Sequence, residues 1–242
     1  MSFLGRFRII SNTDKSAAAR FLVEHATPDF DFFFMIVLSV VMACFGLLMG
    51  SESIVIGSML IAPLLYPVIG VSMGISMGEN ALIRRSVRTV LKASAIAIAA
   101  AFVTGLFASS QVADISLTSE ILLRTEVSLL ILGVAFVSGL AVSYALVRPR
   151  LSETLAGIAI SVALLPPLAV IGLGLSWLNL SVTIGALSVF LLNIGGIIAA
   201  ALIIFSLMNL KENHRAADAA LARENARIKK EEEEVKRADA EE

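Results

Sequence analysis

Prolines interrupt an apolar stretch that is long enough to cross a membrane. Residues Ile54 to Met77 carry no charged side chain, and Pro63 and Pro67 lie in their middle. A membrane-spanning helix needs about 20 residues, but an internal proline removes a backbone donor and clashes with the preceding turn. The backbone groups freed by such a break must be met by protein or by water in a cavity. The stretch is therefore either a kink that shapes packing or part of a binding site, and both interpretations are open.

A second interrupted span follows later in the chain. Leu155 to Trp177 contains Pro166 and Pro167 at its centre. A single ungapped shift superposes the two spans and aligns both interruptions, with Leu64-Leu65 on Leu164-Leu165, Pro67 on Pro167, Gly74 on Gly174 and Ser76 on Ser176. This shared register predicts an internal repeat.

The composition is that of a membrane protein. Of the 242 residues, 57% are hydrophobic and 16% are charged, whereas a soluble domain carries about 25% charged residues. Six apolar spans are expected, at Phe32 to Met49, Ile54 to Met77, Thr89 to Ser109, Leu129 to Val147, Leu155 to Trp177 and Ile184 to Met208. The predicted fold is therefore an all-α integral membrane protein with six transmembrane helices.

Basic residues predict the orientation of these helices, because cytoplasmic loops are enriched in lysine and arginine. Six crossings with both termini in the cytoplasm place all 19 lysines and arginines inside except Arg124. Each repeat then contains three crossings, so the second repeat is inverted relative to the first, and the second helix of each is broken at proline. Inverted repeats with broken helices are typical of several transporter folds.

The resulting organisation has five parts. They are a cytoplasmic amphipathic lead (1–31), a first three-helix repeat (32–110), an external connection (111–128), a second three-helix repeat (129–209) and a charged, helical, cytoplasmic tail (210–242). Within the lead, a helix is expected from Lys15 to Ala26, and the tail is expected to be a solvated helix that extends from the last span.

Several classes of chemistry are excluded by the residues present. Gly70 and Gly74 each begin a G-x-S-x-G pattern, but the serine would need a base nearby, and no histidine lies in any expected span. The single cysteine, Cys44, supports neither a disulfide framework nor a thiolate metal cluster. With a net charge of −1, nucleic acid is not an expected partner. We therefore expect no enzymatic activity, no metal and no cofactor.

The candidate pathway residues are the prolines and the few polar side chains within the spans. No acidic or basic side chain is expected at the membrane midplane, so backbone groups and half-helix ends would hold a ligand. Glu52 and Glu153 each follow a serine at the start of a broken span, where they either cap the helix or guard opposite mouths of the pathway. The pathway candidates themselves are Ser58, Pro63, Tyr66, Pro67, Ser161, Pro166, Pro167 and Asn193.

Small residues predict close helix packing. Gly70, Gly74 and Gly78 recur at every fourth position, a spacing that lets helix backbones approach closely. The same ridge makes a homo-oligomer an expected form of the protein.

The chain resembles a known prokaryotic membrane family. The segment from Ile56 to Leu64, followed by Pro67, and the later segment from Ala163 to Pro167 are similar to hallmark segments of the family catalogued as domain of unknown function 389. The resemblance implies an integral protein of the prokaryotic plasma membrane and supplies no activity. The repeat and its breaks favour a transporter or channel for a small solute or ion. The alternative is a non-transporting scaffold or sensor that acts through its cytoplasmic tail.

Overall fold

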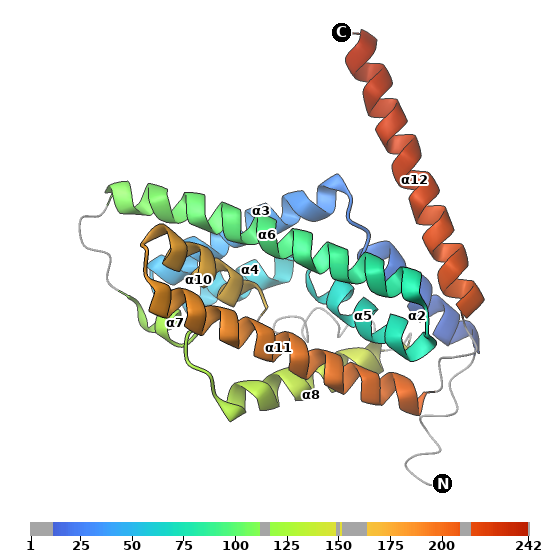
Figure 1. Cartoon of the computed structure of the whole chain (residues 1–242), viewed down its shortest axis with the longest axis horizontal. Coiled ribbons are helices and arrows are strands. Elements are labelled where there is room, and N and C mark those ends of the chain that lie inside the picture. The colour runs from blue at the N-terminus through green and yellow to red at the C-terminus, as the bar shows by residue number, and fades with distance from the viewer. Residues whose placement is uncertain (1–11, 112–116, 149–150, 152–163, 209–213, 242) are drawn as a thin grey trace.

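The computed structural model describes residues 12–111, 117–148, 151, 164–208 and 214–241, and every regular element among them is helical (Figure 1). The all-helical prediction is thus confirmed for this part of the chain. The helices are α2 Asn12–His25, α3 Phe30–Leu48, α4 Glu52–Ile61, α5 Leu65–Met77, α6 Asn80–Gln111, α7 Ser119–Leu122, α8 Leu129–Leu146, α10 Leu165–Ser176, α11 Leu180–Leu207 and α12 His214–Glu241.

Two long helices, α6 and α11, frame the molecule. The short helices α5 and α10 each pack against both of them, so these short helices form the inner layer (Figure 1). α3 covers α4, α6 and α10, and α8 covers α11. The most buried helices are α5 and α10, in which most residues are buried.

The first interrupted span is present as the pair α4 and α5. The axes of the two helices differ by 53°, and Ala62 between them is extended, with ψ of 122°, as expected for a residue before proline. The predicted break at Pro63 is therefore confirmed. The Ser39 hydroxyl of α3 donates a hydrogen bond to the Ser58 carbonyl in the last turn of α4. Protein thus meets part of the polar backbone beside the break.

Four helices are long and apolar enough to cross a membrane, namely α3, α6, α8 and α11, and the number rises to five if α4 and α5 form one span. α10 corresponds to the second half of the fifth expected span. The first half falls in residues 152–163, outside the described part of the chain. α6 begins earlier than the expected Thr89, because the arginines that precede Thr89 are themselves good helix formers.

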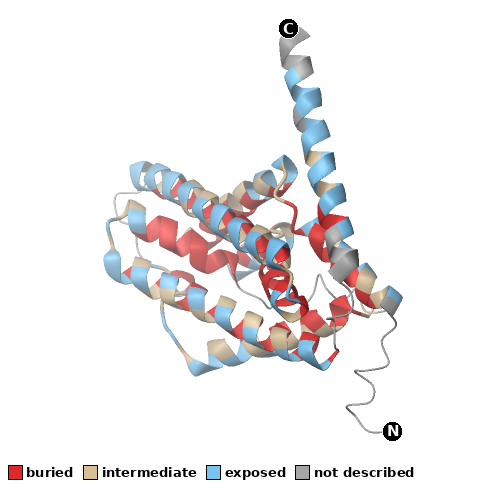
Figure 2. Cartoon of the chain, turned by 45° about the vertical axis from the view of Figure 1, so that its right-hand side comes forward, coloured by how far each residue is buried: buried red, intermediate tan, exposed pale blue. Residues whose placement is uncertain are grey.

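The outer surface of the helices is apolar. Leu129 and Leu130 of α8 are 85% and 81% exposed, and Leu180 of α11 is 68% exposed. Figure 2 shows exposed residues along the outward faces of the long helices and buried residues on the inner helices. Such a surface suits lipid rather than water as the solvent, which supports a membrane protein.

The glycine ridge of α5 packs inside the chain. A Cβ atom added to Gly70 would lie 2.6 Å from Ser86 Oγ, and one added to Gly74 would lie 3.0 Å from the Ile83 nitrogen. The predicted close packing is confirmed, and its partner is α6. Gly78 ends α5 in the left-handed conformation, with φ of 73°. The homo-oligomer stays a prediction, and Gly70 and Gly74 are already engaged by α6.

The lead and the tail meet on one side of the bundle. The lead helix expected from Lys15 to Ala26 is present as α2, and α12 packs against it. Leu221 near the start of α12 is buried, and Arg227 Nη2 lies 2.9 Å from Asp29 Oδ2. The tail helix is confirmed, but its first half is docked, and only its second half projects from the bundle (Figure 1).

Candidate functional site

Contacts with α6 fix the direction of α5. Gly74 lies against Ile83 and Gly70 lies against Ser86, so residue numbers fall on one helix as they rise on the other. The two helices are therefore antiparallel. Counting back along α5 places its first residue, Leu65, near the level of Leu91 on α6.

α10 runs in the opposite direction to α5. Gly172 lies against Ile98, and Gly105 lies against Ser176, so α10 is parallel to α6. Counting back along α10 places its start near the level of Leu91 as well. α5 and α10 thus begin at one level of the bundle and diverge toward its opposite ends (Figure 1).

Both helix starts present the positive end of a helix dipole. The first turn of α10 contains Pro166 and Pro167, and the first turn of α5 contains Pro67. Proline has no backbone N–H, so these starts offer few hydrogen-bond donors. The arrangement attracts negative charge electrostatically without forming a closely fitted anion cradle.

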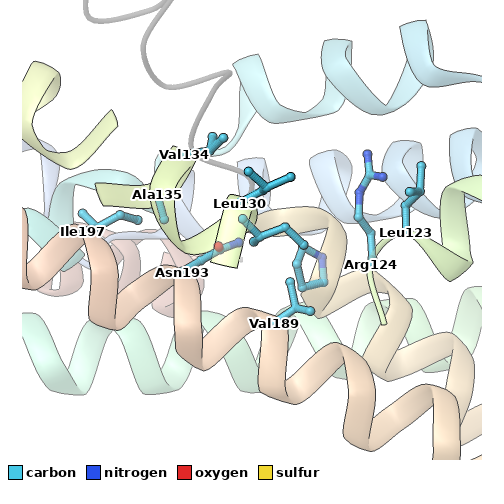
Figure 3. Close-up of a pocket in the computed structure, with 10 residues that line it drawn as sticks. Leu123, Arg124, Leu130, Val134, Ala135, Val189, Asn193 and Ile197 are labelled. Atoms are coloured by element: carbon cyan, nitrogen blue, oxygen red, sulfur yellow. The ribbon is translucent and has the colours of Figure 1, made fainter. Parts of the chain in front are cut away.

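A pocket of about 300 Å³ opens beside the start of α10, a volume at the lower end of the range for small-molecule sites. Two predicted pathway residues, Pro167 and Asn193, line it. Asn193 is buried and points in among the apolar lining (Figure 3). The full lining is Leu123, Arg124, Leu130, Ile131, Val134, Ala135, Pro167, Val189, Asn193 and Ile197.

Arg124 is a lining residue that the sequence analysis did not place in the site. Its Nη2 lies 3.1 Å from Glu120 Oε2, and both side chains are largely buried. In Figure 3 the guanidinium points away from Asn193, so Arg124 contributes its aliphatic part to the pocket. The spacing of four residues between Glu120 and Arg124 was the available signal, since it favours an ion pair within one helical turn.

Other predicted residues of the first break lie outside this pocket. Ser58 is buried and its hydroxyl donates to the Val55 carbonyl at 2.6 Å, so it serves packing within α4. The Tyr66 ring contacts Phe21 and His25 of α2, with ring centroids 5.6 and 5.2 Å apart. Pro67 is buried at the start of α5, and Pro63 is half-buried in the break.

Of the two proposed mouths and the remaining pathway residue, only Glu52 lies in the described part of the chain. Glu52 is exposed in the first turn of α4. Ser51 occupies the cap position before it, but its side chain makes no capping hydrogen bond. Ser161 and Glu153 lie outside the described residues. Across the described residues, no group of histidine, cysteine, aspartate and glutamate side chains could hold a metal ion.

Comparison with known proteins gives two matches in sequence and none in structure. Residues 59–199 match the family described as Domain of unknown function (DUF389). An uncharacterised protein of Methanocaldococcus jannaschii is 32% identical over 173 residues, which cover 71% of this chain and 52% of that protein. The chain thus spans about half the length of this curated relative. No solved structure matches the chain.

Proposed function

This chain belongs to the family of domain of unknown function 389, and from that premise we propose that it moves a small solute or ion across a prokaryotic plasma membrane. The proposed site lies at the membrane midplane between the two broken helices, at the level where α5 and α10 begin. The pocket beside Pro167 and Asn193 is the observation that carries the proposal. The proposed topology has six crossings with both termini in the cytoplasm. No catalytic step is part of the proposal.

Local geometry supports the internal repeat on which this proposal depends. The Glu79 nitrogen donates to the Gly74 carbonyl at 2.9 Å, and the Asn179 nitrogen donates to the Gly174 carbonyl at the same distance. Gly74 packs against the following helix at Ile83, as Gly174 does at Thr183. Both turns therefore join a half-helix to a long helix in the same way.

Contacts between the two halves follow the same register. The Ser72 hydroxyl donates to the Ile198 carbonyl at 3.4 Å, and a Cβ on Gly172 would lie 2.6 Å from the Ile98 carbonyl. Each half-helix thus touches the long helix of the other half at the equivalent position. This reciprocal pairing is what an approximate twofold axis between inverted repeats produces.

The pocket chemistry suits a small ligand with limited polarity. Most of the lining is aliphatic, and the Asn193 amide offers both a donor and an acceptor. The ends of two helix dipoles add a positive potential at the same level. Small neutral solutes and monovalent anions are therefore the classes to test first.

Two single-cysteine variants on α8 test the pathway. Val134 lines the pocket, whereas Val137, one turn further, is similarly exposed at 63% but does not line it. In a chain with Cys44 replaced by alanine, each single cysteine is reacted with a charged thiol reagent. Solute and anion flux into proteoliposomes is then measured. We expect modification of Val134→Cys to reduce flux and modification of Val137→Cys to leave it unchanged. Equal flux after both modifications would remove this pocket from the pathway.

A scaffold or sensor is the second candidate, and the docked tail favours it. Arg227 connects α12 to Asp29 between α2 and α3, so a partner that pulls on the tail would act on the start of the first span. The two functions differ in flux, because a scaffold does not need an open pocket. A chain that transports none of the solutes and anions tested in proteoliposomes, but binds a partner through α12, would fit the second candidate.

A further inference from the structure

A second pocket, of about 400 Å³, lies at the N-terminal end of α6, between that helix and the tail. Four basic residues of α6 line it, together with Asn225 of α12. The rest of its lining is Pro28, Ala81, Thr89, Leu221 and Ile228. α6, the lead and the tail therefore build this pocket jointly. The basic residues are Arg84, Arg85, Arg88 and Lys92.

The positive charge of this pocket is not balanced by its lining. No carboxylate lines it. Within the described part of the chain, Arg84, Arg88 and Lys92 make no ion pair and donate no side-chain hydrogen bond. They follow one another at every fourth position, so three cations share one face of α6, and like charges at that spacing destabilise a helix.

Three carboxylates of the lead and the tail are engaged by a different arginine. Arg227 Nε lies 3.1 Å from Glu224 and 3.7 Å from Glu231, and its Nη2 lies 2.9 Å from Asp29. Glu224 still acts on Arg85 at longer range. One arginine of the tail is thus surrounded by acids, while the stripe on α6 faces the pocket without them.

Arg85 gives the pocket a fixed donor. Its Nη1 donates to Asn225 Oδ1 and its Nη2 donates to Thr27 Oγ1, both at 2.9 Å. Its Nε is buried and has no hydrogen-bond partner among the described residues. The guanidinium is therefore held in place by the lead and the tail, and part of its donor capacity stays unused.

We propose that this pocket binds a phosphate group and that the bound phosphate holds α12 against α6. A phosphate carries up to two negative charges and several strong acceptor oxygens, and arginine pairs with it in a bidentate geometry. A pocket of about 400 Å³ admits one such group. This proposal is independent of transport.

Two sources supply this chemistry, a phospholipid headgroup and a soluble phosphate. No charged residue lies between Lys92 and the end of α6 at Gln111, so the stripe ends where the apolar part of the helix begins. Basic residues at such a boundary are the usual neighbours of anionic headgroups.

The test uses the full chain in phosphate-free neutral detergent. Hydrogen exchange of α12 and thermal unfolding are measured against inorganic phosphate, pyrophosphate and short-chain phosphatidic acid. Chloride at matched ionic strength and short-chain phosphatidylcholine serve as reference additions. We expect phosphate groups to slow exchange across the first half of α12 and the reference additions to leave it unchanged. Protection by phosphatidic acid alone assigns a lipid source, and protection by the inorganic ions assigns a soluble one.

A matched pair of double variants locates the site. Arg84→Gln with Arg88→Gln removes two pocket charges, and Lys229→Gln with Lys230→Gln removes two charges from α12 outside the pocket. Because charged hydrogen bonds to phosphate are strong, we expect the first variant to bind about tenfold more weakly or worse. The second should bind as the natural chain does. Equal binding by both variants, or protection by chloride as strong as by phosphate, would overturn the proposal. If the first variant unfolds, Lys92→Gln replaces it.

Discussion

The contact of Gly172 with the backbone of α6 gives the sharpest stability prediction. A Cβ atom added to Gly172 would lie 2.4 Å from Ala101 Cβ, 2.6 Å from the Ile98 carbonyl oxygen and 2.8 Å from the Phe102 nitrogen. Two of these atoms belong to the backbone of α6 and cannot rotate away. Gly172→Ala must therefore push α10 away from α6.

The magnitude follows from two opposing terms. Overpacking a tight contact costs about 1–3 kcal/mol, and the rigid backbone atoms argue for the upper part of that range. Alanine recovers about 0.5–1 kcal/mol as a better helix former than glycine. The net loss is about 2 kcal/mol, which at 2–4 °C per kcal/mol lowers Tm by roughly 4–8 °C.

Gly133 and Gly195 provide controls within the same bundle. A Cβ on either meets no atom within 4 Å, so Gly133→Ala and Gly195→Ala should be neutral or gain about 0.5 kcal/mol from helix propensity. Thermal unfolding of all three variants in detergent makes the comparison. If Gly172→Ala is as stable as Gly133→Ala, then α10 does not approach α6 as closely as the structure places it.

Three further predictions concern the breaks, the buried ion pair and the topology. Pro63→Ala combined with Pro67→Ala should favour a straight helix, since proline costs about 3 kcal/mol in a helix interior. We expect proteoliposome flux to fall while membrane insertion is retained, and full flux would exclude the break from the mechanism. Arg124→Met should lower the free energy of unfolding by about 3–5 kcal/mol because it leaves Glu120 buried and unpaired. Thermal unfolding should show recovery when Glu120→Gln is added, and equal Tm values for the single and double variants would contradict the pairing. A lone cysteine at Asn179 should react with an impermeant thiol reagent from outside intact cells, whereas cysteines in α12 should not, and the reverse pattern would invert the orientation.

Local rules account for what the sequence predicts well. Proline acts on its own turn of helix, so the interruption at Pro63 is visible in the sequence and appears as a 53° bend. Apolar length predicts the spans in the same way. The start of α6 is less predictable, because Arg84 and Arg85 resemble a polar connection in a hydropathy pattern yet favour the helix in the structure.

Contacts between distant segments account for what was missed. Tyr66, a predicted pathway residue, also packs on Phe21 and His25 of α2, and a pattern within its own span cannot reveal this contact. The meeting of Asn193 with Pro167 in one pocket depends on how α10 and α11 pack. Likewise, the docking of α12 depends on Asp29 and Arg227, which are 198 residues apart.

The reciprocal pairing of the two halves has a consequence for biosynthesis. Ser72 of α5 contacts Ile198 of α11, which is 126 residues later in the chain. At about 5–20 residues per second, roughly 6–25 s of translation separate the two partners. During that interval the face of α5 that carries Ser72 has no α11 to cover it. The first half therefore enters the bilayer before α11 covers this face of α5. The insertion machinery or the lipid must shield the face until α11 has been synthesised and inserted.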